Sequence, residues 1–149
     1  MCAMPEHMQP DLIVLAPDVP DVALIAEVRQ ELLDRQAIEA QLREYMLDNR
    51  CSVALLVTPS KTWIYRDTLH DFTEASIREV GEFDTTEILG LKRSLTNEVD
   101  LFHAVREWLE HLASAWASAL PLASGPRKPV VEYIVPALIE GRVLSGSLA

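Results

Sequence analysis

Three short apolar runs of strand length limit the folds that are open to this chain. They are rich in branched residues and occur at 11–17 (DLIVLAP), 22–29 (VALIAEVR) and 52–58 (SVALLVT). Runs this short, bounded by turn-forming residues, predict buried strands. The sequence PDVPD follows the first run and predicts a turn, so we expect the first two strands to pair as a hairpin.

Helix-forming residues separate the second run from the third. They extend from Glu31 to about Arg50 and place Ile38, Leu42, Tyr45, Met46 and Asn49 on one face. After the third strand, Pro59 and Ser60 interrupt the apolar pattern ahead of TWIYRD at 62–67. A second hairpin is therefore predicted over 52–67.

The segment 71–97 leaves its boundaries open. IREVGEF is typical of an edge strand, whereas the acidic and hydroxyl residues at 84–87 resemble a capping box that opens a short helix. Beyond it, 98–118 carries a wide apolar stripe at helical spacing, made of Leu101, Phe102, Val105, Trp108, Leu109, Leu112 and Trp116. Such a helix must be covered by its own sheet or by a partner chain.

The last part of the chain predicts another helix. A loop at 122–129 precedes VVEYIVPALIEG, which we expect to form a helix split at Pro136 and ended by Gly141. The whole order predicts a mixed α/β (α+β) fold, a central sheet flanked by helices with a helical C-terminal part. We expect one domain over 1–149, in which 98–142 covers the sheet or mediates self-association.

Charge and cysteine content limit the possible functions. The 149 residues include 13 basic and 23 acidic side chains, a net charge of −10, so the chain has no bulk attraction for phosphate backbones. Cys2 and Cys51 form neither a disulfide framework nor a zinc motif. With no signal peptide pattern and no apolar run long enough to span a bilayer, the sequence predicts a cytoplasmic protein without membrane contact.

One set of polar residues lies in or beside the predicted strands and helix and is a candidate for a catalytic or metal-binding site. Pro10 and Asp11 precede the first strand, Glu27 and Arg29 lie in the second, and Gln41 and Tyr45 lie in the first helix. Side chains two residues apart on a strand share a face, so Glu27 and Arg29 point the same way. In an apolar strand they must be paired, solvated or bound to metal. An ordinary salt bridge at an exposed strand end is the alternative interpretation.

This pattern resembles the PD-(D/E)XK nuclease superfamily, which has the restriction-endonuclease-like fold. The resemblance covers 9–67 and includes QLREY, which is similar to the Gln and Tyr element of the exonuclease branch. It implies a divalent-metal-dependent phosphodiesterase acting on DNA or RNA, with Asp11 and Glu27 as ligands of Mg²⁺ or Mn²⁺. Arg29 would stand at the position of the motif lysine, and Gln41 and Tyr45 would support the catalytic site.

The sequence departs from that family at two points. Arg29 replaces the lysine that positions the attacking water, and a planar, permanently charged guanidinium is a poor substitute for it. The first helix of the superfamily, which often adds another acid, has no space before Asp11 in this sequence. Lys61 is a candidate for a migrated lysine. The alternative function is therefore a catalytically inactive interaction protein of the same fold, a homo-oligomer, most simply a dimer, formed through the C-terminal stripe.

Two other groups of residues have a structural and a functional interpretation. Trp63 and Tyr65 alternate along a predicted strand, where cross-strand packing is favoured over stacking on nucleic-acid bases. His103 and His111 are eight residues apart on the predicted C-terminal helix. Without a third ligand they are expected to be solvated or to lie at the edge of the core, and not to bind metal.

Overall fold

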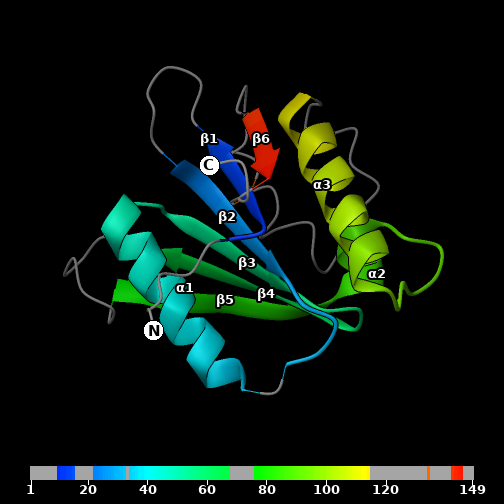
Figure 1. Cartoon of the computed structure of the whole chain (residues 1–149), viewed down its shortest axis with the longest axis horizontal. Helices are drawn as coiled ribbons and strands as arrows, with labels where there is room; N and C mark the ends of the chain where they lie inside the picture. The colour runs from blue at the N-terminus through cyan, green and yellow to red at the C-terminus, as the bar shows by residue number, and fades with distance from the viewer. Residues whose placement is uncertain are drawn as a thin grey trace, which may run out of the picture.

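A mixed sheet with helices on both faces forms the structure, a computed structural model that describes residues 10–15, 22–32, 34–67, 76–114, 134 and 142–145 (Figure 1). This confirms the predicted mixed α/β class. The elements are β1 (Leu12–Leu15), β2 (Val22–Val28), α1 (Arg35–Asn49), β3 (Val53–Val57), β4 (Lys61–Asp67), β5 (Ile77–Asp84), α2 (Thr85–Leu89), α3 (Glu98–Ser114) and β6 (Arg142–Ser145).

The six strands lie in the order β5-β4-β3-β2-β1-β6. Strands β2 and β3 are parallel and are connected through α1, while every other neighbouring pair is antiparallel. Both predicted hairpins, β1–β2 and β3–β4, are confirmed, and β5 forms one edge of the described sheet as expected. Strand β6 was not predicted. It pairs with β1 at the other edge.

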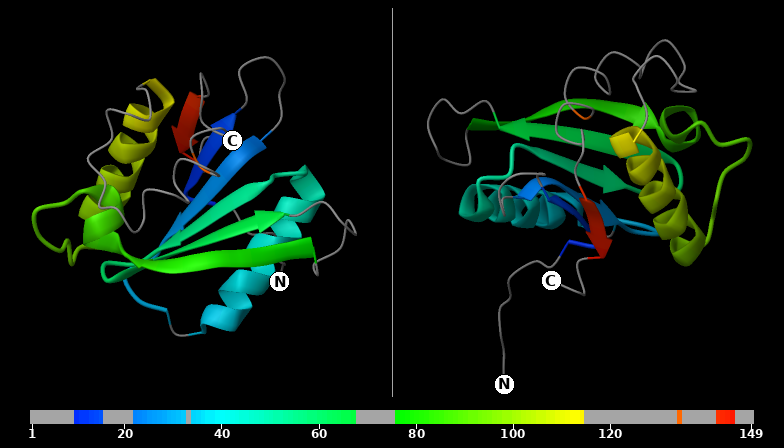
Figure 2. Two further views of the ribbon diagram at one scale, coloured as in Figure 1. Left: turned by 180° about the vertical axis from the view of Figure 1, so that it is seen from behind. Right: turned by 90° about the horizontal axis from the view of Figure 1, so that it is seen from above.

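Alternate side chains of the strands build two apolar layers. Leu24, Ala26 and Val28 of β2 face the layer that includes α3, whereas Ile25 faces the layer that includes Leu42 of α1. Helix α1 accordingly lies in front of the sheet in Figure 1 and behind it in the left view of Figure 2. Burial of β2 and β3 on both faces agrees with their apolar sequences, which only Glu27 of β2 interrupts.

The predicted stripe of α3 is buried within this chain. Its described members with less than a tenth of their surface exposed are Leu101, Val105, Trp108, Leu109 and Leu112. These side chains pack in the layer that faces β2, and they are therefore covered by the chain's own sheet. Trp116 lies outside the described residues, as does the helix predicted over 130–141 apart from Ile134, which is buried in the same layer.

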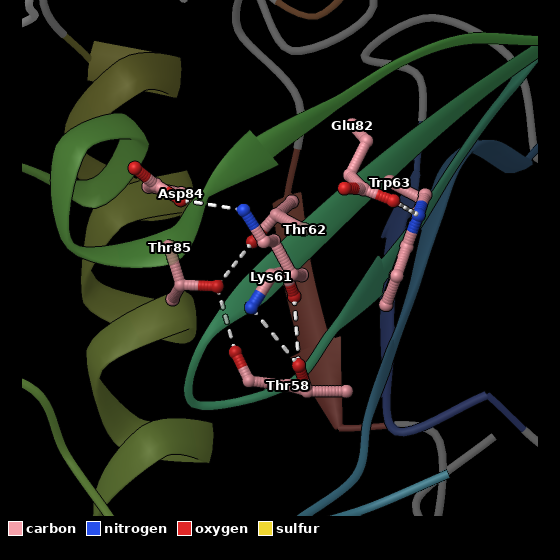
Figure 3. A network of polar contacts seen from close by, with 7 residues as sticks. All are labelled: Thr58, Lys61, Thr62, Trp63, Glu82, Asp84 and Thr85. Carbon is pink, nitrogen blue, oxygen red and sulfur yellow. Dashed lines mark hydrogen bonds and ion pairs between the residues drawn. The ribbon is translucent and has the colours of Figure 1, made fainter.

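Local signals explain most of the helix ends. Asp34 caps α1 through its side chain, which accepts a hydrogen bond from the N–H of Ala37 at 3.1 Å, and Arg50 ends the helix in a left-handed conformation with φ 53°. The predicted capping box at α2 is confirmed only in part. Asp84 is the N-cap residue, but its carboxylate makes no cap hydrogen bond, because it accepts from Lys61 Nζ at 2.8 Å (Figure 3).

Buried hydroxyl groups form hydrogen bonds between the start of α2 and the β3–β4 hairpin (Figure 3). The Thr62 and Thr85 hydroxyls are 2.8 Å apart, and Thr85 Oγ1 donates to the carbonyl of Thr58 at 2.7 Å. Each buried oxygen thus has a partner, which removes the cost of taking it out of water. In the described part of the chain, no helix is both long and apolar enough to cross a membrane.

Candidate functional site

The β1–β2 hairpin brings the two predicted acids together at one end of the sheet. Leu12 pairs with Ala26, so the register places Asp11 opposite Glu27. The N–H of Asp11 donates to Glu27 Oε1 at 3.2 Å, and Asp11 Oδ2 accepts from the N–H of Val28 at 2.8 Å. Each acid is therefore held by the backbone of the opposite strand.

Arg29 binds the second oxygen of Glu27. Its Nη2 donates to Glu27 Oε2, as the shared face of positions i and i+2 predicts. The backbone of Arg29 continues the sheet through an N–H that donates to the carbonyl of Val57 at 2.9 Å. The side chain of Glu27 is 4% exposed and that of Arg29 is 41% exposed. The guanidinium thus lies on the solvent side of a buried carboxylate.

The burial of Glu27 changes its protonation. Its pKa is raised from 4.5 to about 7, chiefly by desolvation and in second place by the negative charge of Asp11. The charge of Arg29 and its hydrogen bond act in the opposite direction and lower the pKa. Glu27 therefore carries a full charge only above neutral pH, in a pair that Arg29 partly neutralises.

A cavity of about 160 Å³ opens beside Asp11. Its other lining residues are Val28 and, from the first turns of α3, Glu98, Val99 and Phe102. The loop after β2 is tied to the same helix, because the N–H of Gln30 donates to Glu98 Oε2 at 3.1 Å. No sequence pattern indicates Glu98, since no local spacing relates it to an acid 87 residues earlier in the chain.

Gln41 and Tyr45 are not brought to the acid pair. Helix α1 begins where β2 ends and rises about 1.5 Å per residue, so Tyr45 lies about 15 Å along the helix from Arg35. Its pKa is raised by burial and by the neighbouring Cys51, which precedes β3 and so marks the opposite end of the sheet from Glu27. Gln41 is exposed to solvent.

Lys61 does not replace the missing lysine. It lies in the β3–β4 hairpin, two strands away from β2, and its Nζ donates to Asp84 Oδ1 at 2.8 Å (Figure 3). This ion pair directs the ammonium toward the end of β5. The hydrogen bond and charge of Asp84 raise the pKa of Lys61, so the side chain stays protonated and committed to that partner.

Trp63 and Tyr65 pack within the sheet, as predicted. Both are buried in the layer under α1, where the guanidinium of Arg35 lies 4.5 Å from the centre of the Trp63 ring. Trp63 Nε1 donates to Glu82 Oε1 at 2.8 Å, and the Tyr65 hydroxyl donates to Glu39. Neither ring is free to stack on a base.

The chemistry of the donors decides which ligand the acid pair can take. Two carboxylates on adjacent strands fit a hard divalent ion, which binds carboxylate oxygen, water and substrate phosphate. The Arg29 guanidinium does not fit such a metal site, because it is permanently positive and already donates a hydrogen bond to Glu27 Oε2. Among the described residues, no group of three or more His, Cys, Asp or Glu side chains is placed to hold a metal ion, and His103 and His111 are both exposed.

Comparison with protein-family models, with curated proteins and with solved structures found no match.

Proposed function

We propose that this chain is a PD-(D/E)XK-like interaction domain that has lost hydrolytic activity. The observation that carries the proposal is the Glu27 carboxylate, whose two oxygens are bonded inside the protein by the Asp11 N–H and by Arg29. A metal-dependent phosphodiesterase needs these oxygens for its cation. The superfamily assignment is part of the proposal and is supported by the hairpin, the helix and the parallel strand that follow in the expected order.

Charge disfavours the approach of a phosphate backbone to this site, and therefore its cleavage there. The surroundings of Asp11 include Glu98 at the start of α3, and the chain as a whole has a net charge of −10. A phosphate backbone approaching this end of the sheet meets carboxylates, with Arg29 already bound to one of them. Self-association stays a prediction. The described part of the α3 stripe is buried within the chain and does not provide the surface for it.

The second candidate is an active nuclease that uses Mg²⁺ or Mn²⁺. It is favoured by one observation, the close approach of Asp11 and Glu27 on neighbouring strands. In this candidate the two acids would hold the ion, which would activate water and stabilise the developing charge on the phosphate. Arg29 would have to leave Glu27 and contact the phosphate.

Thermal unfolding in the presence of Mn²⁺ and Mg²⁺ separates the two candidates. Wild type is compared with the Asp11→Ala/Glu27→Ala double variant, and no substrate is needed. The proposal expects the same small response to metal in both proteins. A saturable stabilisation confined to wild type, about 2.7 kcal/mol at a hundred times the dissociation constant, would favour the nuclease.

A further inference from the structure

We propose that Arg29 is a built-in counter-ion that keeps divalent cations out of the Asp11–Glu27 pair, and that removing its charge opens a divalent-cation site there. This inference rests on the proposed function, in which the acid pair is kept while hydrolysis is lost. It goes further by assigning that loss to one side chain. The rest of the site would then be intact.

The hydrogen bonds show which oxygens a cation could use. Glu27 Oε1 and Asp11 Oδ2 both accept from backbone N–H groups, and these bonds belong to the hairpin. Glu27 Oε2 accepts only from Arg29 in the described contacts, and Asp11 Oδ1 has no described partner. Removing the guanidinium thus frees Glu27 Oε2, so that each acid has one oxygen outside the backbone hydrogen bonds that position it.

The position of Arg29 explains why it competes well with a free cation. It lies two residues from Glu27 on the same face of β2, and its backbone N–H is fixed to Val57. A cation from solution must lose translational freedom and part of its hydration shell on binding, whereas the guanidinium is delivered by its own strand. Its side chain also covers the solvent side of the buried carboxylate. The positive charge of Arg29 and its cover over the Glu27 carboxylate therefore both disfavour the binding of a free cation.

The experiment measures Mn²⁺ binding by the loss of the free-ion signal in electron paramagnetic resonance, at pH 8. The proteins are wild type, Arg29→Met, Arg29→Met/Asp11→Asn and the control Lys61→Met. The control also removes one positive charge from an ion pair at the same end of the sheet, but from Asp84. Circular dichroism checks that each variant is folded, and Arg29→Gln replaces Arg29→Met if the latter does not fold.

The proposal expects Arg29→Met to bind about one Mn²⁺ per chain at least tenfold more tightly than wild type. Lys61→Met should behave as wild type, and the added Asp11→Asn change should abolish the gain. The inference is overturned if folded Arg29→Met binds no better than wild type, or if Lys61→Met gains as much. Tight binding by wild type itself would overturn both the proposed function and this inference, whereas weak binding by both wild type and folded Arg29→Met would overturn the inference alone, so the two failures are distinguishable.

Discussion

Two ion pairs at the same end of the sheet differ in how their acids are buried. The side chain of Glu27, paired with Arg29 on β2, is 4% exposed, while that of Asp84, paired with Lys61, is 52% exposed. The cations are alike, at 41% and 43%. Because a buried charge depends on its partner far more than a solvated one does, we expect the Glu27 pair to affect stability and ligand choice more than the Asp84 pair.

The largest expected effect comes from breaking the buried pair. Arg29→Ala leaves the Glu27 carboxylate without its cation, and we expect a loss of about 3 kcal/mol in the free energy of unfolding. Urea unfolding at pH 8 measures it. Glu27→Leu is the matched variant, because replacing the acid with an apolar side chain leaves no buried charge. A loss from Arg29→Ala no larger than from Lys61→Ala would remove the distinction between the two pairs.

A smaller effect is expected from pH. The pKa of Glu27 is raised to about 7 in the folded protein, above its ordinary 4.5, so its protonated form favours the fold. This contribution is fully present below about pH 4.5 and is lost as the pH rises through about 7. We expect wild type to lose about 2 kcal/mol between pH 5 and pH 8 through this group.

The measurement is urea unfolding across that pH range for wild type and Glu27→Gln. The amide keeps the shape of the side chain but does not titrate, so the variant should lack this part of the pH dependence. If the free energy of unfolding changes equally with pH in the two proteins, Glu27 ionises normally. Arg29 would then neutralise it fully, which would sharpen its assignment as the counter-ion.

The smallest effect is expected at the exposed pair. Lys61→Ala removes the ion pair with Asp84, yet water solvates both groups in either state. The urea midpoint should therefore be indistinguishable from wild type in 0.5 M salt, where screening removes the remaining attraction. A clear loss of stability that persists in salt would show that Lys61 anchors the hairpin to α2 and is not a surface pair.

Much of the fold could be predicted from local patterns. Apolar runs bounded by prolines located β1 to β4, and helical spacing located α1 and α3, because these signals depend only on neighbouring residues. The strand β6 could not be predicted in this way. RVLS is a short sequence with no strong pattern, and it becomes a strand by pairing with β1 across more than a hundred residues.

The candidate site was predicted in part. The family resemblance implied that Asp11 and Glu27 lie in one site, and the register of the first hairpin does place them opposite one another. Tyr45 was misplaced relative to them, because a helical turn tells which face a residue occupies but not which end of the sheet it reaches. Glu98 was missed because its approach to Asp11 depends on how α3 packs.

Local sequence patterns were sufficient for most strand and helix segments, for the mixed α/β class and for the shared face of Glu27 and Arg29, because each depends on periodicity or on residues close along one element. Tertiary packing was needed to show that Glu27 is buried and paired with Arg29 at the surface, and that Lys61 is paired with Asp84. Burial and long-range pairing are set by the packing of whole elements, which no local pattern encodes.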